Sequence, residues 1–160
     1  MIVTASAPKH QTCLDLGAAL AIDYKTEDFQ QKALEFTNGK GVDGIIDFIA
    51  APYFLKNIDA LATDGRMVIL ALMGGLNVDD FNLGKMLRKR LKVMGSTLRA
   101  RTRDYQIRLT QDLKSFAVPL IEQGKIKPVI DSVFDWSQVA EAHQYMEANK
   151  NTGKIILKIS

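Results

Sequence analysis

The N-terminal stretch MIVTASAPKHQTCLDLGAALAIDY, Met1 to Tyr24, gives the clearest indication of the fold. A short apolar run, Ile2 to Ala7, predicts a strand that ends in small residues. A helical segment, Lys9 to Leu16, follows and should end at Gly17, because glycine favours the left-handed conformation after a helix. A second apolar run, Ala18 to Ile22, predicts another strand. Strand, helix and strand in such a short stretch indicate a βαβ unit.

Polar residues stand at or just past the ends of these two predicted strands. They are Ser6, Lys9 and Tyr24. In open parallel sheets ligands bind beyond the carboxyl ends of the strands. A serine, a lysine and a helix N-terminus beside one another favour an anion site at this edge.

Strands and helices continue to alternate through the next part of the chain, which predicts an α/β fold with a doubly wound parallel sheet. Buried strands read as nearly continuous apolar runs, and helices show an apolar stripe between turn residues. The expected helices cover about Glu27–Phe36, Tyr53–Ala62 and Leu83–Arg90, and the expected strands cover Val42–Ile49, Arg66–Leu72 and Lys92–Thr97, with a turn at Asp64-Gly65.

The remainder of the sequence predicts a long helix, followed by an extended segment, a second helix and a final strand. The helix should run from Asp104 to Gln123 and stop at Gly124. Asp135 to Gln138 has the composition of a helix N-cap. The other expected elements are an extended Lys125–Ile130, a helix at Val139–Ala148 and a strand at Lys154–Ile159.

Composition bounds the class of protein. The 160 residues are 47% hydrophobic and 24% charged, as in ordinary globular domains. The single cysteine, Cys13, excludes a disulfide framework, which fits a cytoplasmic location. Two histidines and one cysteine argue against a catalytic zinc site, so no metal ligand is proposed. No apolar run is long enough for a transmembrane helix, and no membrane partner is expected.

Two stretches carry a resemblance to a known family. DALATDGRMVILALMGG, Asp59 to Gly75, and VAEAHQYMEANKNTGKIIL, Val139 to Leu157, resemble the medium-chain dehydrogenase/reductase superfamily. Within it, the chain looks most like the zinc-free quinone oxidoreductase branch, of the p53-inducible type. The fifteen-residue spacing from Lys9 to Tyr24 is also similar to that branch.

The resemblance implies an NADPH-dependent reductase of quinones or conjugated carbonyls, with a Rossmann-like domain. It places Ser6 and Lys9 on the 2′-phosphate of NADPH and Tyr24 near the adenosine. The remaining implied cofactor contacts are Ile49, Leu72, Met73, Gly74, Leu98, Arg99 and Asn149. No residue is assigned a catalytic role.

The family carries a first Rossmann strand and a Gly-rich turn ahead of the region that this chain resembles. The expectation is therefore a truncated NADP-binding domain at 1–124, followed by a segment at 125–160 that in the family returns to the substrate domain. Two rival readings stay open. One is an inactive module that dimerises through its edge strand, and the other is a different α/β nucleotide-binding domain.

A basic stretch from Lys85 to Arg103 holds eight lysines or arginines and no acid. Nucleic-acid binding is one interpretation. A solvated helix and a charged sheet edge are favoured, because edge strands are often protected by lysine and arginine, and the net charge is only +3. No nucleic-acid partner is therefore expected. The resemblance implies a homodimer through the strand at Leu91–Leu98.

Overall fold

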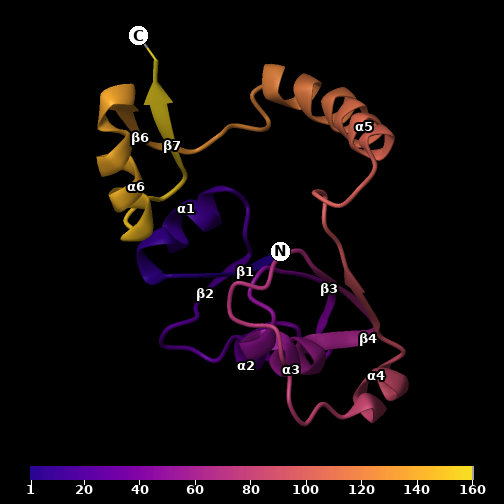
Figure 1. Cartoon of the computed structure of the whole chain (residues 1–160). Helices are drawn as coiled ribbons and strands as arrows, with labels where there is room; N and C mark the ends of the chain where they lie inside the picture. Colours follow the sequence, from indigo (N-terminus) through magenta and orange to yellow (C-terminus); the bar gives the residue numbers. More distant parts are fainter. Residues whose placement is uncertain (160) are drawn as a thin grey trace. The chain divides into compact units, whose positions relative to one another are not determined.

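The structure is a computed structural model that describes residues 1–159. The chain forms two compact units, Met1–Arg101 and Thr102–Ser160 (Figure 1). The domain boundary expected at residues 124 and 125 refers to the parent family and stays a prediction. No helix among the described residues is long and apolar enough to span a membrane.

The first unit begins with the expected βαβ arrangement. Strand β1 (Ile2–Ala5) pairs in parallel with β2 (Leu20–Asp23), and η1 (Ala7–Lys9) and α1 (His10–Asp15) connect them. Gly17 has a φ of +95°, which confirms its predicted place after the helix. The predicted βαβ unit is therefore confirmed.

A second, three-stranded sheet follows in the same unit, in the order β3-β4-β5, with both pairs parallel. Its strands are β3 (Val42–Asp47), β4 (Leu61–Ile69) and β5 (Lys92–Gly95). The helices around it are α2 (Phe29–Phe36), α3 (Ala51–Ala60) and α4 (Leu83–Lys89).

One face of this sheet carries the core. Met67, in the middle of β4, is fully buried against Ile58 of α3 and Leu91 just ahead of β5, and Met86 of α4 packs on the same cluster. The Cα register places Ile45, Met67 and Val93 in one row across the three strands. Since neighbouring residues alternate between the two faces, the next row lies on the opposite face. It consists of Ile46, Val68 and Met94.

The start of β4 differs from the prediction. The turn expected at Asp64-Gly65 lies inside the strand, which begins at Leu61 instead of Arg66. The register between β3 and β4 shifts at this point, and Asp64 has a φ of +63°. The two residues that predict a turn therefore form an irregularity within the strand, which is a common role for such residues in sheets.

The single sheet expected from the sequence is divided. Among the described residues, β1-β2 and β3-β4-β5 are separate hydrogen-bonded sheets in the first unit, and β6-β7 is a third in the second unit. All paired strands are parallel, and the α/β, Rossmann-like fold class is confirmed.

The second unit contains α5 (Arg103–Glu122), β6 (Ile130–Asp135), η2 (Trp136–Gln138), α6 (Val139–Glu147) and β7 (Lys154–Lys158). Gly124 follows α5 with a φ of +69°, as predicted. Helix α5 has no buried residue, although its sequence has an apolar stripe. Strand β6 begins at Ile130, the last residue of the predicted extended segment, and it pairs in parallel with β7.

Candidate nucleotide-binding site at the carboxyl ends of the strands

The carboxyl ends of β1 and β2 lie side by side, because Ala5 and Asp23 are opposite each other in the parallel register. Ser6 follows β1 and is buried, with 9% of its surface exposed. Tyr24 follows β2 and is 40% exposed. Two predicted cofactor residues therefore lie at the carboxyl-terminal end of the same sheet.

Lys9 belongs to the same turn as Ser6. It ends η1, and its backbone N–H donates to the Ser6 carbonyl at 2.9 Å. The next residue, His10, holds the turn against β1 through a hydrogen bond of 2.9 Å between its Nε2 and the Ala5 carbonyl. This turn brings Ser6 and Lys9 together, and their assignment to a 2′-phosphate stays a prediction.

Tyr24 has an aromatic neighbour from α3. Burial raises the pKa of the Tyr53 hydroxyl, and the nearby Tyr24 raises the same pKa further. The Tyr53 ring also lies 4.7 Å, centroid to centroid, from that of Phe29 at the start of α2. The end of β2 is therefore flanked by an aromatic surface, which suits a flat ring such as adenine.

The loops after β3 and β4 are joined by backbone hydrogen bonds. The Met73 N–H donates to the Phe48 carbonyl at 3.1 Å, and the Gly74 N–H donates to the Ile49 carbonyl at 2.8 Å. The predicted residues Ile49, Met73 and Gly74 are thus brought together. A Cβ added to Gly74 would lie 2.7 Å from the Pro52 side chain, so this approach requires glycine.

The Asp47 side chain fixes the loop after β3 through hydrogen bonds. It is 4% exposed, and its Oδ1 accepts hydrogen bonds from the Ile49 N–H at 2.7 Å and the Ala50 N–H at 3.1 Å. Its Oδ2 accepts one from Asn57 Nδ2 on α3 at 3.0 Å. A buried carboxylate is stable only with such partners, and here the partners fix the loop.

Ala50 adopts an unusual backbone conformation in this loop, with a φ of 69° and a ψ of −116°. It is also buried, with 5% of its surface exposed. Residues other than glycine rarely adopt such conformations, and those that do cluster at functional sites. The Asp47 hydrogen bonds maintain this conformation.

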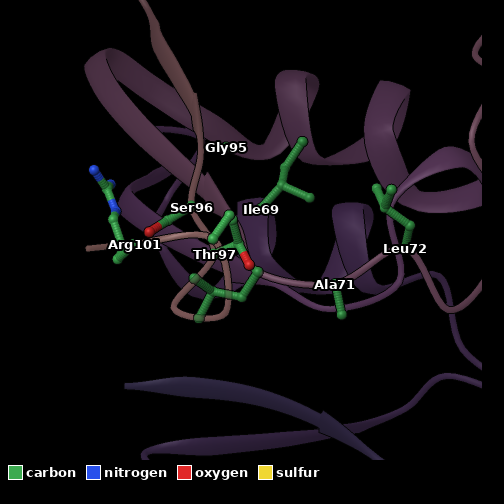
Figure 2. Close-up of a pocket in the computed structure, with 9 residues that line it drawn as sticks. Ile69, Ala71, Leu72, Gly95, Ser96, Thr97 and Arg101 are labelled. Carbon is green, nitrogen blue, oxygen red and sulfur yellow. The ribbon is translucent and has the colours of Figure 1, made fainter. Parts of the chain in front are cut away.

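A cavity of about 640 Å³ opens beyond the carboxyl ends of β4 and β5. Figure 2 shows side chains from both strand ends around it. The apolar side is formed by Ile69 to Leu72, and the polar side chains come from Ser96, Thr97 and Arg101. The lining is completed by Gly95 and Ala100.

The predicted nicotinamide residues divide between this cavity and its surroundings. Leu72 lines it. Leu98 and Arg99 lie in the segment that carries Thr97 and Ala100 but are not among the lining residues. Asn149 lies in the second unit, just after α6, with a φ of 52°. The cofactor roles of all these residues stay predictions.

Sequence reasoning missed Asp47, Asn57 and the polar lining residues. One signal was available for Asp47, because it is an acid inside an otherwise apolar predicted strand. No sequence signal distinguishes Ser96, Thr97 or Arg101 from ordinary loop residues.

Three cations of the basic stretch are engaged in local contacts. Lys85 Nζ lies 2.8 Å from an Asp59 carboxylate oxygen, and Arg90 pairs with Asp64 at 2.6 Å. Lys89 Nζ donates to the backbone carbonyls at the end of α3, including that of Leu61 at 2.7 Å. These contacts favour the interpretation as a charged structural surface, and the expected absence of nucleic-acid binding stays a prediction.

A comparison with known families decides the identification. The profile described as "Zinc-binding dehydrogenase" matches residues 16–157, nearly the whole chain. This chain belongs to the zinc-binding dehydrogenase family. The predicted membership of the medium-chain dehydrogenase/reductase superfamily is confirmed, and the assignment to the zinc-free quinone oxidoreductase branch is finer than these matches establish.

Two curated relatives illustrate the similarity. The synaptic vesicle membrane protein VAT-1 homolog of Mus musculus is 30% identical over 96% of this chain and 41% of its own length. Quinone oxidoreductase-like protein 2 of Bos taurus is 26% identical over 96% of this chain and 44% of its own length. The chain therefore spans less than half the length of these curated relatives.

A crystal structure of an NAD-dependent alcohol dehydrogenase superposes with a TM-score of 0.78 and 28% identity. The match covers 99% of this chain and 43% of the other. The name of the matched family implies zinc, but residues 1–159 contain no group of three or more His, Cys, Asp or Glu side chains that would hold a metal ion. No step of the proposed chemistry is therefore assigned to zinc.

Proposed function

We propose that this chain is the coenzyme-binding portion of an NADPH-dependent reductase of quinones or conjugated carbonyls. The observation that carries the proposal is the cavity at the carboxyl ends of β4 and β5, with an apolar wall at Ile69–Leu72 and polar groups at Ser96 and Thr97. Such a lining suits a nicotinamide ring, which has flat apolar faces and one amide.

The chemistry of the cofactor defines what the protein residues do. Bound NADPH supplies a hydride to an electron-poor carbon of the substrate. The apolar wall at Ile69–Leu72 excludes water from one side of the ring, and Thr97 and Arg101 orient its polar substituents. The joined loops at Ile49 and Gly74 hold the rim of this site in a fixed conformation.

The preference for NADPH over NADH is assigned to the turn after β1. Lys9 and Ser6 share this turn, and a lysine at a phosphate is a strong charge-assisted partner. A cytoplasmic location and a homodimer through Leu91–Leu98 belong to the same proposal. The dimer is supported by β5, which pairs with β4 alone among the described strands and so leaves one edge free.

The test of the NADPH assignment is a titration of wild type and Lys9→Ala with NADPH and NADH. We expect saturable binding that favours NADPH, and about tenfold weaker NADPH binding in Lys9→Ala with NADH unchanged, equivalent to ~1.4 kcal/mol. The matched control is Lys25→Ala, which removes a lysine just after β2. An unchanged NADPH/NADH ratio in Lys9→Ala would contradict the assignment.

The free edge of β5 also supports a second function, an inactive module that dimerises through this strand. Sedimentation with and without NADPH distinguishes the two functions. A dimer that binds neither nucleotide supports the second function, whereas binding that favours NADPH, by either monomer or dimer, supports the first. Nucleotide binding without NADPH preference would favour the remaining rival, another α/β nucleotide-binding domain.

A further inference from the structure

Two consecutive peptide groups of the loop after β3 bridge Asp47 and the segment after β4. The Phe48–Ile49 peptide donates its N–H to Asp47 Oδ1 at 2.7 Å and accepts from the Met73 N–H at 3.1 Å. The Ile49–Ala50 peptide donates its N–H to the same oxygen at 3.1 Å and accepts from the Gly74 N–H at 2.8 Å. The N–H and C=O of a trans peptide point in opposite directions. Each peptide is therefore held between the carboxylate and residues 73 and 74.

The orientation of the second peptide depends on these hydrogen bonds, because this peptide leads into a strained residue. Ala50 connects it to α3 with a φ of 69° and a ψ of −116°, which residues with a Cβ rarely adopt. The Ala50 carbonyl accepts from the Tyr53 N–H, in the first turn of α3, at 2.9 Å. Rotation of the Ile49–Ala50 peptide would relieve Ala50, and the hydrogen bonds to Asp47 and Gly74 oppose that rotation.

The segment that receives these hydrogen bonds includes the apolar wall of the cavity. Leu70 and Leu72 line the cavity, and Met73 and Gly74 follow directly in the chain. The Leu70 N–H donates to the Asp47 backbone carbonyl at 2.8 Å. Asp47 therefore holds the wall segment at its start through its backbone, and at its end through its carboxylate and the two bridging peptides.

We propose that Asp47 is a positioning residue for coenzyme binding, which holds Leu70–Leu72 in the conformation that packs against the nicotinamide ring. This role rests on the proposed function. Asp47 is 4% exposed, and its carboxylate accepts hydrogen bonds from the loop and from Asn57 of α3. Its oxygens are engaged inside the protein, so its effect on the coenzyme passes through the loop and the wall. A preformed apolar surface binds a flat ring at a lower cost in conformational entropy.

Titration of Asp47→Ala with NADPH and with NADH tests this role. We expect both nucleotides to bind about tenfold more weakly than to wild type, because the wall that packs on the nicotinamide is common to both. The NADPH/NADH ratio should not change, in contrast to Lys9→Ala. The matched control is Leu61→Ala, which truncates a buried core side chain at the opposite end of β4. It should also destabilise the fold, but it should bind both nucleotides like wild type.

Two further variants distinguish positioning from a general loss of stability. Asp47→Asn keeps a side-chain oxygen that accepts from both loop N–H groups, and it should bind NADPH within about twofold of wild type. Asp47→Ala combined with Ala50→Gly should recover about threefold of the lost NADPH affinity, because glycine adopts the Ala50 conformation without a Cβ penalty. Ala50→Gly combined with Leu61→Ala should leave NADPH affinity unchanged.

Hydrogen exchange without nucleotide tests the positioning step by itself. In Asp47→Ala, the amides of residues 71–75 should exchange at least about tenfold faster than in wild type, because the peptides that accept from Met73 and Gly74 are no longer held. The amides of residues 92–95, in β5, should accelerate less. In Leu61→Ala the two segments should accelerate alike, since a core truncation acts on the stability of the whole unit.

Four results would overturn the role of Asp47. The first two are equal NADPH affinity of Asp47→Ala and Leu61→Ala, and binding by Asp47→Asn as weak as that by Asp47→Ala. The others are no recovery of affinity with Ala50→Gly, and exchange in residues 71–75 that accelerates no more than in residues 92–95. Wild type that binds neither nucleotide would instead contradict the proposed function, and the exchange comparison alone would then decide whether Asp47 fixes the wall.

Discussion

Asp47 is the residue on which the rim of the candidate site most depends. Its buried carboxylate accepts hydrogen bonds from two loop N–H groups and from Asn57 of α3. This single side chain joins the end of β3, the loop at Ala50 and the middle of α3. Its effect on the site is through the conformation of the loop.

Replacing Asp47 by alanine should therefore destabilise the first unit. The change leaves two N–H groups and the Asn57 amide without an acceptor, which we expect to cost about 3 kcal/mol of the free energy of unfolding. The control is Asp43→Ala on the same strand, whose side chain is 84% exposed and should cost less than about 0.5 kcal/mol. Urea denaturation measures both, and equal small losses would show that the Asp47 contacts contribute little.

Replacing Ala50 by glycine should stabilise the folded protein. Its φ of 69° and ψ of −116° are costly for any residue with a Cβ. We expect Ala50→Gly to raise the free energy of unfolding by about 1 kcal/mol, after the entropic cost of glycine. Ala51→Gly, one residue later at the first position of α3, should lower it by less than about 0.5 kcal/mol. A loss of stability in both variants would mean that Ala50 is not strained.

At the scale of elements, the sequence predicted the order and type of most helices and strands. The apolar runs at β5 and β7 were sufficient, since these strands contain no residues typical of a turn in their interior. Strand β3 was predicted although Asp43-Gly44 lies inside it, because the apolar residues after this pair continue the run. The start of β4 was wrong because Asp64-Gly65 has the composition of a turn, and only pairing with β3 shows that it lies within a strand. The predicted extended segment Lys125–Ile130 shares only Ile130 with β6, because the signal before Pro128 indicates extended backbone and does not show that pairing with β7 begins at Ile130.

Helix α2 illustrates how the cap residues determine an element. Asp28 is its N-cap and accepts hydrogen bonds from the Gln30 and Gln31 N–H groups, while Lys56 of α3 lies 2.7 Å from its other oxygen. The Lys56 hydrogen bond is the largest cause that lowers the pKa of the Asp28 carboxyl below its usual value, and the Gln31 N–H lowers it further. This N-cap therefore also joins α2 to α3.

The lowered pKa predicts a specific pH dependence. The charge on Asp28 stabilises the folded state above the unfolded pKa, about 3.9. This contribution is lost as pH falls through the lower folded pKa. Because Asp28 is partly exposed and screened by solvent, we expect Asp28→Asn to be less stable by only about 0.5 kcal/mol at pH 6.

Denaturation of wild type and Asp28→Asn from pH 6 to pH 2 measures this contribution. The difference between them should be constant down to about pH 4 and then shrink. Asp43→Asn, whose carboxylate lies 3.8 Å from Lys40 and is largely exposed, is the control. A difference that grows on acidification would have the wrong sign for a lowered pKa.

At the scale of the whole molecule, the sequence predicted the α/β class and the residues at four strand ends. Ser6 and Tyr24 lie beside each other after β1 and β2, and Ile49 lies beside Gly74, as a parallel sheet requires. The division into separate sheets was not predicted as such. Neighbours in a sheet are set by pairing between distant parts of the chain, and periodicity along a sequence carries no information about that pairing.

The most direct test of the coenzyme-binding proposal is hydrogen exchange in the presence of saturating NADPH, with NADH as the comparison. Binding at the strand ends predicts slower exchange in residues 6–9, 69–75 and 95–101, with a weaker effect of NADH at residues 6–9. Protection confined to other segments, or no protection at millimolar NADPH, would contradict the proposal that these strand ends form a nucleotide site.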